Sequence, residues 1–146
     1  FMDPKYFKDA KKEAMEKIDY SKKLNILGSD ISGRAISLAK QNAINAGVGE
    51  DISFITRDFG SVALADDYGV FISNPPYGMR LSDNDLVDIY KKINNKLAGL
   101  DTWSLYFITA DEKFDRTFKR KISKKRKLYN GGQKVDFYQY FGKRPD

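Results

Sequence analysis

The sequence predicts an α/β fold of the Rossmann-like type, with a mostly parallel sheet and an antiparallel strand at its C-terminal end. Short apolar segments alternate with longer ones whose apolar residues recur every three or four positions, which is typical of strands alternating with surface helices. The ending "KVDFYQYFG" instead alternates residue by residue, like a late antiparallel strand. With 146 residues, 41% of them hydrophobic, we expect a single domain spanning residues 1–146.

The first half reads as helix, strand, helix, strand. "DPKYFKDAKKEAMEKI" has an N-cap candidate in Asp3, a proline at the first helical position and apolar residues at helical spacing. "LNILGSD" is an apolar strand ending at Asp30, and Ser32 can cap a following helix that stops at Gly47. "DISFITRD" is the second predicted strand and ends at Asp58.

The second half continues the alternation. "YGVFIS" is a third strand, and its mostly apolar run predicts burial on both faces. "NDLVDIYKKINNKLAGL" is an amphipathic helix closing near Gly99, and "TWSLYFIT" is a fourth strand whose Trp103 we expect in the core. Another helix is predicted after Asp111, because Phe114 and Phe118 are four residues apart. No repeat, low-complexity tract or linker divides the chain.

Composition excludes several classes of chemistry. Cysteine and histidine are absent, so there are no disulfides, no thiolate metal sites and no imidazole base, and we predict no metal site. The net charge of +6 and the pI near 9.3 favour a polyanionic partner, although basic composition also occurs in proteins that bind none. No apolar stretch is long enough for a membrane span or resembles a signal peptide, so we expect a cytoplasmic protein with no membrane contact.

Two predicted strands end in aspartate, where open α/β sheets bind their ligands. Asp30 can accept hydrogen bonds from both hydroxyls of a ribose. Asp58 would lie one strand away, near enough to accept from an adenine amino group while Phe59 or Ile31 covers the ring. Each aspartate taken singly is more often an ordinary cap or turn former.

The third strand ends in Asn-Pro-Pro-Tyr, and the prolines hold Asn74 and Pro75 extended beyond it. The Pro75 carbonyl and the Asn74 side chain are two acceptors held apart, which suits a planar exocyclic NH2 group. Tyr77 offers a flat face for the ring that bears this amine. The alternative is a rigid turn with Tyr77 packed in the core.

The segments "SDISGRAISLAKQNAINAGV", "ITRDF", "SNPPYGMRL" and "KRKLYNGGQKVDFYQYF" resemble the catalytic domain of the bacterial ribosomal RNA guanine-N2 methyltransferases. Some of these relatives carry an upstream RNA-binding THUMP domain, and some are named N6-adenine-specific DNA methylases. The resemblance runs from about Leu24 to the C-terminus and implies a class I methyltransferase sheet that uses S-adenosylmethionine. It implies cofactor contacts at Asp30, Ile31, Asp58, Phe59 and Asn74, and a target amine held by Asn74, Pro75 and Tyr77.

One feature of that family is missing from the sequence. An acidic residue followed by closely spaced glycines should precede the first predicted helix, and the sequence contains no such loop there. Together with the start at Phe1, this predicts an N-terminally incomplete domain. We therefore expect the intact protein to be an enzyme, and this chain alone to bind S-adenosylmethionine weakly and to be inactive.

A basic run before the last predicted strand is the candidate nucleic-acid contact. A run of this kind is as often a solvated face. Tyr129 and Asn130 follow it, either near the mouth of the pocket or, for Tyr129, in the core. Arg80 could meet phosphate or pair with a neighbouring aspartate. The predicted phosphate contacts are Arg80, Lys119, Arg120, Lys121, Lys124, Lys125, Arg126 and Lys127.

Three functions remain open from the sequence. The first is methyl transfer to guanine N2 of ribosomal RNA, with RNA as the partner. The second is methylation of another amine, either adenine N6 in DNA or a protein glutamine amide, because the same acceptors would serve each. The third is a nucleic-acid-binding fragment without catalysis, which the missing glycine loop favours.

Overall fold

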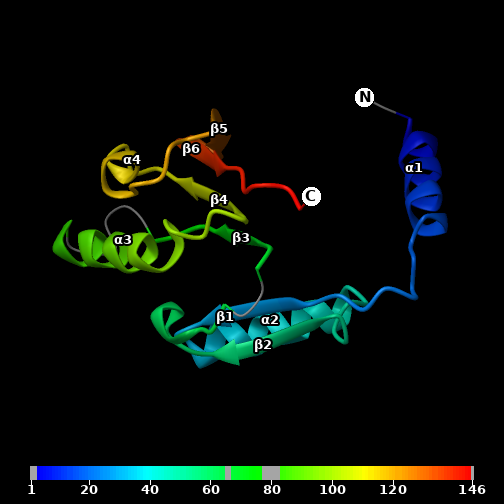
Figure 1. Cartoon of the computed structure of the whole chain (residues 1–146). Helices are drawn as coiled ribbons and strands as arrows, with labels where there is room; N and C mark the ends of the chain where they lie inside the picture. The colour runs from blue at the N-terminus through cyan, green and yellow to red at the C-terminus, as the bar shows by residue number, and fades with distance from the viewer. Residues whose placement is uncertain (1–2, 65–66, 77–82, 146) are drawn as a thin grey trace. The chain divides into compact units, whose positions relative to one another are not determined.

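The structure is a computed structural model that describes residues 3–64, 67–76 and 83–145. Tyr77 and Arg80 of the predicted site lie outside the described residues. The chain forms two compact units, Phe1–Val62 and Ala63–Asp146, whose elements are shown in Figure 1. Within the described part of the chain, no helix is both long and apolar enough to cross a membrane.

The first unit has the predicted helix, strand, helix, strand order. Its elements are α1 (Pro4–Glu16), β1 (Ile26–Asp30), α2 (Gly33–Asn45), β2 (Ile52–Thr56) and a short 3-10 turn, η1 (Phe59–Ser61). Both predicted caps are confirmed: the Asp3 carboxylate accepts from the Lys5 amide at 2.8 Å, and the Ser32 hydroxyl accepts from the Ala35 amide at 3.3 Å. Gly47 follows α2 with φ of 75°, the left-handed conformation that ends helices.

Strands β1 and β2 pair in parallel, from Ile26 opposite Ile52 to Asp30 opposite Thr56. Helix α2 lies along this pair and buries Ile36 and Ala43 (Figure 1). Strand β2 ends at Thr56, two residues before the predicted end at Asp58. Asp58 is the N-cap of η1.

The second unit holds a four-stranded sheet in the order β3-β4-β6-β5. Strands β3 and β4 are parallel, and β6 is antiparallel to both β4 and β5. This mixture of parallel and antiparallel pairing confirms the predicted fold class. The elements of the unit are β3 (Gly69–Ser73), α3 (Asp83–Leu97), β4 (Trp103–Thr109), α4 (Phe114–Thr117), β5 (Lys124–Asn130) and β6 (Gln133–Tyr140).

An aromatic core covers one face of this sheet. Phe107 of β4 packs against Phe114 of α4 and against Phe118, which caps that helix, with ring centroids 5.0 and 5.4 Å apart. Tyr140 of β6 lies 4.8 Å from Phe118, and Tyr90 of α3 lies 5.1 Å from Phe114. Helices α3 and α4 therefore share this face, and the predicted four-residue spacing of Phe114 and Phe118 serves the core.

The structure differs from the sequence expectations in this unit. Strand β3 is not buried on both faces, because Val70 is 63% exposed and Ile72 is 75% exposed. Trp103 is half-buried and lies over Gly69, where an added Cβ would come within 2.6 Å of the indole ring. The basic run was not predicted as a strand but forms β5, an edge strand exposed along its whole length. The sheet thus ends in an antiparallel hairpin and not in a single antiparallel strand.

Candidate functional site

In the first unit, the two predicted ligand aspartates follow neighbouring parallel strands. Asp30 is the last residue of β1 and lies opposite Thr56, and its carbonyl accepts from the Arg57 amide at 2.8 Å. Asp58 follows two residues beyond Thr56. Both carboxylates therefore stand at the carboxyl edge of the β1–β2 pair, as the sequence predicted.

Each carboxylate also forms a local turn. Asp30 Oδ1 accepts from the Ser32 amide at 2.7 Å, and Asp58 Oδ1 accepts from the Gly60 amide at 2.8 Å. These bonds are those of an ordinary turn former, and each uses Oδ1 of the aspartate. Among the described residues, Oδ2 of Asp30 has no partner, so an exposed acceptor remains at the end of β1.

Apolar side chains flank both aspartates. Ile31 is 74% exposed directly after Asp30, and Phe59 is half-buried directly after Asp58. An exposed apolar side chain beside a polar acceptor can cover one face of a flat ring while the acceptor binds its edge. Each aspartate at this edge is thus followed directly by an apolar side chain.

In the second unit, Asn74 and Pro75 leave β3 at its carboxyl end. Ser73, the last residue of β3, lies opposite Phe107 of the parallel strand β4. Asn74 is exposed and Pro75 is buried, so the buried ring anchors the segment while the amide side chain faces solvent. The predicted stacking partner Tyr77 lies outside the described residues.

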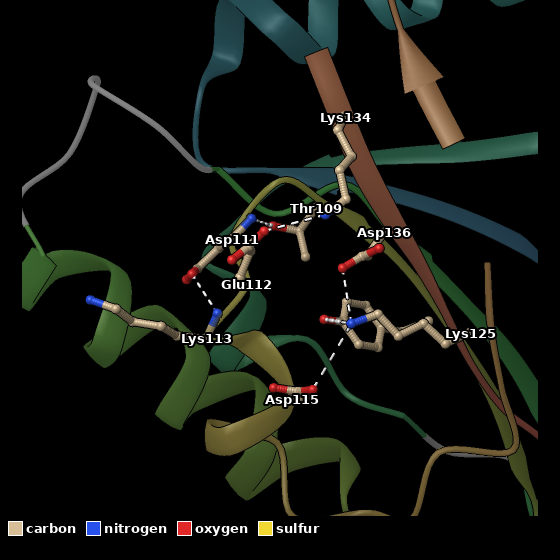
Figure 2. Close-up of polar contacts among 9 residues, drawn as sticks. Thr109, Asp111, Glu112, Lys113, Asp115, Lys125, Lys134 and Asp136 are labelled. Atoms are coloured by element: carbon tan, nitrogen blue, oxygen red, sulfur yellow. Dashed lines mark hydrogen bonds and ion pairs between the residues drawn. The ribbon is translucent and has the colours of Figure 1, made fainter. Parts of the chain in front are cut away.

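The segment after β4 contributes polar groups that the sequence reasoning missed. The hydroxyl of the buried Thr109 accepts from the Asp111 amide at 3.1 Å, and the Asp111 carboxylate accepts from the Lys113 amide at 2.8 Å (Figure 2). Glu112 pairs with Lys134 of β6 at 3.3 Å. These contacts fix a turn at the same carboxyl edge that Asn74 follows.

Two of the predicted phosphate-binding cations are held inside the second unit. The Arg120 guanidinium donates to the carbonyls of Leu100 and Phe141 at 3.1 and 3.0 Å, and burial lowers its pKa. Lys125 Nζ lies 2.9 Å from Asp136 Oδ2 and donates to the Tyr138 hydroxyl at 2.9 Å (Figure 2).

Partial burial works against the charged form of Lys125, but its hydrogen bonds to Tyr138 and Asp136 outweigh burial and raise its pKa. Lys125 is therefore a fixed structural cation. Arg126 and Lys127 are exposed, and neither has a carboxylate partner in the described part of the chain; the same holds for Lys119, Lys121 and Lys124. The basic run therefore divides into internal and solvent-facing cations, which sequence alone could not separate.

A model of the RMKL-like methyltransferase domain matches residues 1–139. The chain belongs to this family. It is 42% identical over 135 residues to YpsC of Bacillus subtilis, provisionally named an RNA methyltransferase, covering 92% of this chain and 35% of YpsC. It is 37% identical over 120 residues to ribosomal RNA large subunit methyltransferase K/L of Shewanella frigidimarina, covering 81% of this chain and 17% of that protein. The chain thus spans about a third or less of these relatives.

Solved structures agree with this membership. SMU.472, provisionally named a methyltransferase and crystallised with S-adenosylhomocysteine, matches with a TM-score of 0.84 and 37% identity over 100% of this chain and 39% of its own. A Listeria monocytogenes protein, provisionally named an N6-adenine-specific DNA methylase, matches with a TM-score of 0.79 and 38% identity over 98% of this chain and 37% of its own. The family resemblance, the methyltransferase fold and S-adenosylmethionine as the family's methyl donor are confirmed.

Proposed function

We propose that the intact protein containing this chain transfers a methyl group from S-adenosylmethionine to an exocyclic amino group of a nucleic-acid base, namely guanine N2 in large-subunit ribosomal RNA. The carrying observation is the Asn74–Pro75 exit from a parallel strand in a chain of the RMKL-like methyltransferase family. The names of YpsC and of the K/L relative support RNA as the substrate class.

The residues of the first unit fit the adenosine part of the cofactor. The second carboxylate oxygen of Asp30 would accept from the ribose hydroxyls, and Asp58 would accept from the adenine amine. Ile31 and Phe59 would cover the adenine ring. S-adenosylmethionine supplies an electrophilic methyl group on its sulfonium sulfur.

Asn74 and Pro75 would activate the target amine. An aromatic amine is a poor nucleophile because its lone pair is delocalised into the ring. The Asn74 side chain and the Pro75 carbonyl would each accept a hydrogen bond from one N–H of the amine. These two hydrogen bonds would favour a pyramidal nitrogen whose lone pair points away from the ring system. The rate then comes from alignment and electrostatics, and the proton leaves after the nitrogen has become cationic, so that no histidine is needed.

The amine of a paired base is out of reach inside a duplex. The target base must be flipped out or already single-stranded, and Tyr77 would replace part of its lost stacking. The exposed cations after α4 would hold the neighbouring phosphates. These are Lys119, Lys121, Lys124, Arg126 and Lys127, with Arg80 as a further candidate.

The test is Asn74→Ala in the intact protein, assayed with radiolabelled S-adenosylmethionine on ribosomal RNA. We expect turnover to fall by at least about 100-fold, the loss typical of a transition-state hydrogen-bond partner, with cofactor affinity nearly unchanged. Asn95→Ala is the matched control, because Asn95 is an exposed asparagine on α3. Wild-type turnover in Asn74→Ala would end the assignment.

Parallel assays on other substrates separate the alternatives. Label on DNA would indicate adenine N6, the target named for the Listeria relative. Label on protein would indicate a glutamine amide. Nucleic-acid binding without label on any substrate would leave a non-catalytic binding protein.

A further inference from the structure

The β5–β6 hairpin extends beyond the end of β4. Thr109, the last residue of β4, lies opposite Asp136 of β6. The hairpin strands continue past this point with the pairs Leu128–Val135, Tyr129–Lys134 and Asn130–Gln133. The turn is formed by Gly131 and Gly132, where Gly131 has φ of 60°. The tip therefore projects from the same carboxyl edge of the sheet at which Asn74 follows β3, and β5 lies three strand positions from β3.

Tyr129 lies at this projecting tip and is not a core residue. It is 74% exposed, whereas Tyr138 and Tyr140 on the partner strand are fully buried. An exposed aromatic side chain on a solvated edge strand gains little from packing, so its ring is available to a partner.

Two lysines lie on the same face of the β5–β6 hairpin as Tyr129. Lys127 precedes it by two residues, which places both side chains on the same face of β5. Lys134 lies directly opposite Tyr129 on β6, and Figure 2 shows its side chain reaching toward Glu112. Lys134 pairs with the exposed Glu112. Lys127 is exposed and has no carboxylate partner among the described residues.

The position of the tip suits a neighbouring nucleotide and not the target base itself. From β3 to β5 the sheet spans three strand spacings, roughly 15 Å. A ring at that distance from Asn74 cannot hold the base whose amine Asn74 binds. It can hold a base a few nucleotides along an extended single strand.

We propose that Tyr129 is a stacking platform for a base that flanks the target nucleotide in single-stranded RNA, with Lys127 contacting the adjacent phosphate. Stacking on an aromatic ring combined with a nearby cation is the usual way in which proteins hold single strands. The platform rests on the proposed function and adds to it a site that selects unpaired RNA next to the target.

The test measures binding of the intact protein to a fluorescein-labelled single-stranded RNA of about a dozen nucleotides, a length within the usual range of single-strand sites. Tyr129→Ala should weaken binding by about 5- to 150-fold, whereas Tyr129→Phe, which keeps the ring, should stay within about twofold. Tyr20→Ala is the control, because Tyr20 is 83% exposed in the other unit.

Salt dependence separates stacking from charge and from misfolding. Tyr129→Ala should leave the slope of log affinity against log salt unchanged, while Lys127→Gln should reduce its magnitude by about 0.7, the value for one phosphate on a single strand. Unchanged affinity of Tyr129→Ala in a protein that still methylates RNA would overturn the platform and leave the proposed function standing. Absence of methyl transfer in the wild type would instead remove the proposed function and the platform with it.

Discussion

Asp136 and Lys125 form an ion pair that fastens β5 to β6. Asp136 Oδ2 lies 2.9 Å from Lys125 Nζ, and the side chains are 9% and 36% exposed. Asp115 of α4 lies farther from the same ammonium, at 4.0 Å, and Asp136 Oδ1 has no hydrogen-bond partner among the residues that the structure describes. A buried carboxylate thus depends on one cation that comes from the middle of the basic run.

Lys125→Met should therefore destabilise the protein far more than a neighbouring substitution. It leaves the Asp136 carboxylate buried without its partner, and we expect a loss of about 1–3 kcal/mol, below the value for a fully buried pair because Lys125 is partly exposed. Urea unfolding of the intact protein measures this. Lys124→Met is the control and should cost less than about 0.5 kcal/mol, because Lys124 is exposed on the opposite face of β5. Equal midpoints for the two variants would contradict the structural role.

Because the phenol of Tyr90 is buried, we expect the protein to lose stability at alkaline pH. Burial raises its pKa from 10.0 to about 12, and the nearby Asp111 carboxylate adds to this shift. The folded state favours the neutral phenol, so this contribution is complete below pH 10 and is lost as the pH rises toward 12.

Tyr90→Phe should remove that part of the alkaline loss, about 1 kcal/mol at pH 11, while costing little at pH 7. Thermal unfolding between neutral pH and pH 11 measures the difference, with Tyr20→Phe as an exposed control. A Tyr90→Phe protein with the alkaline profile of the wild type would show that this phenol is not responsible.

Asp30→Asn should keep the role of residue 30 in the turn after β1 and weaken its proposed contact with the cofactor. Asparagine keeps an acceptor oxygen for the Ser32 amide, so the turn after β1 should persist with an unfolding temperature close to that of the wild type. The charge and the second acceptor oxygen are lost, and a hydrogen bond to a charged group is worth about 1.5–3 kcal/mol, so S-adenosylmethionine affinity should fall about 10- to 100-fold. Calorimetry on the intact protein tests this, with Asp51→Asn as an exposed control. An unchanged affinity would leave Asp30 as a turn former only.

Local pattern was sufficient to predict most of the fold. Apolar runs bounded by turn residues identified β1, β2, β3 and β4, and Asp3 and Ser32 marked the starts of two helices. Strand β5 was missed because "KKRKLYN" has no apolar alternation; it forms through its register with β6 and the turn at Gly131. An edge strand exposed on both faces leaves no hydrophobic period to read.

The sequence predicts the positions of site residues that lie at strand ends. It does not predict which cations form ion pairs with residues of other strands. The positions of Asp30, Asp58 and Asn74 follow from strand ends, which the sequence marks. The separation of Lys125 from Lys127 depends on a carboxylate in another strand, and no spacing rule encodes it. The roles of these residues toward cofactor and RNA stay predictions.

A comparison of Arg120 with Arg126 tests which cations of the basic run are structural and which are proposed to bind RNA. The Arg120 guanidinium donates to the Leu100 and Phe141 carbonyls and so joins the loop before β4 to the end of β6, whereas Arg126 is exposed on β5. Arg120→Gln should lower the free energy of unfolding by about 1–3 kcal/mol and leave the salt slope of RNA binding unchanged. Arg126→Gln should leave stability within about 0.5 kcal/mol of the wild type and reduce the slope by about 0.7. Urea unfolding and RNA titrations at several salt concentrations measure both quantities on the same two proteins. If Arg120→Gln alone reduced the slope, the assignment of these two cations would be reversed, because an arginine committed to backbone carbonyls releases no counterion when RNA binds.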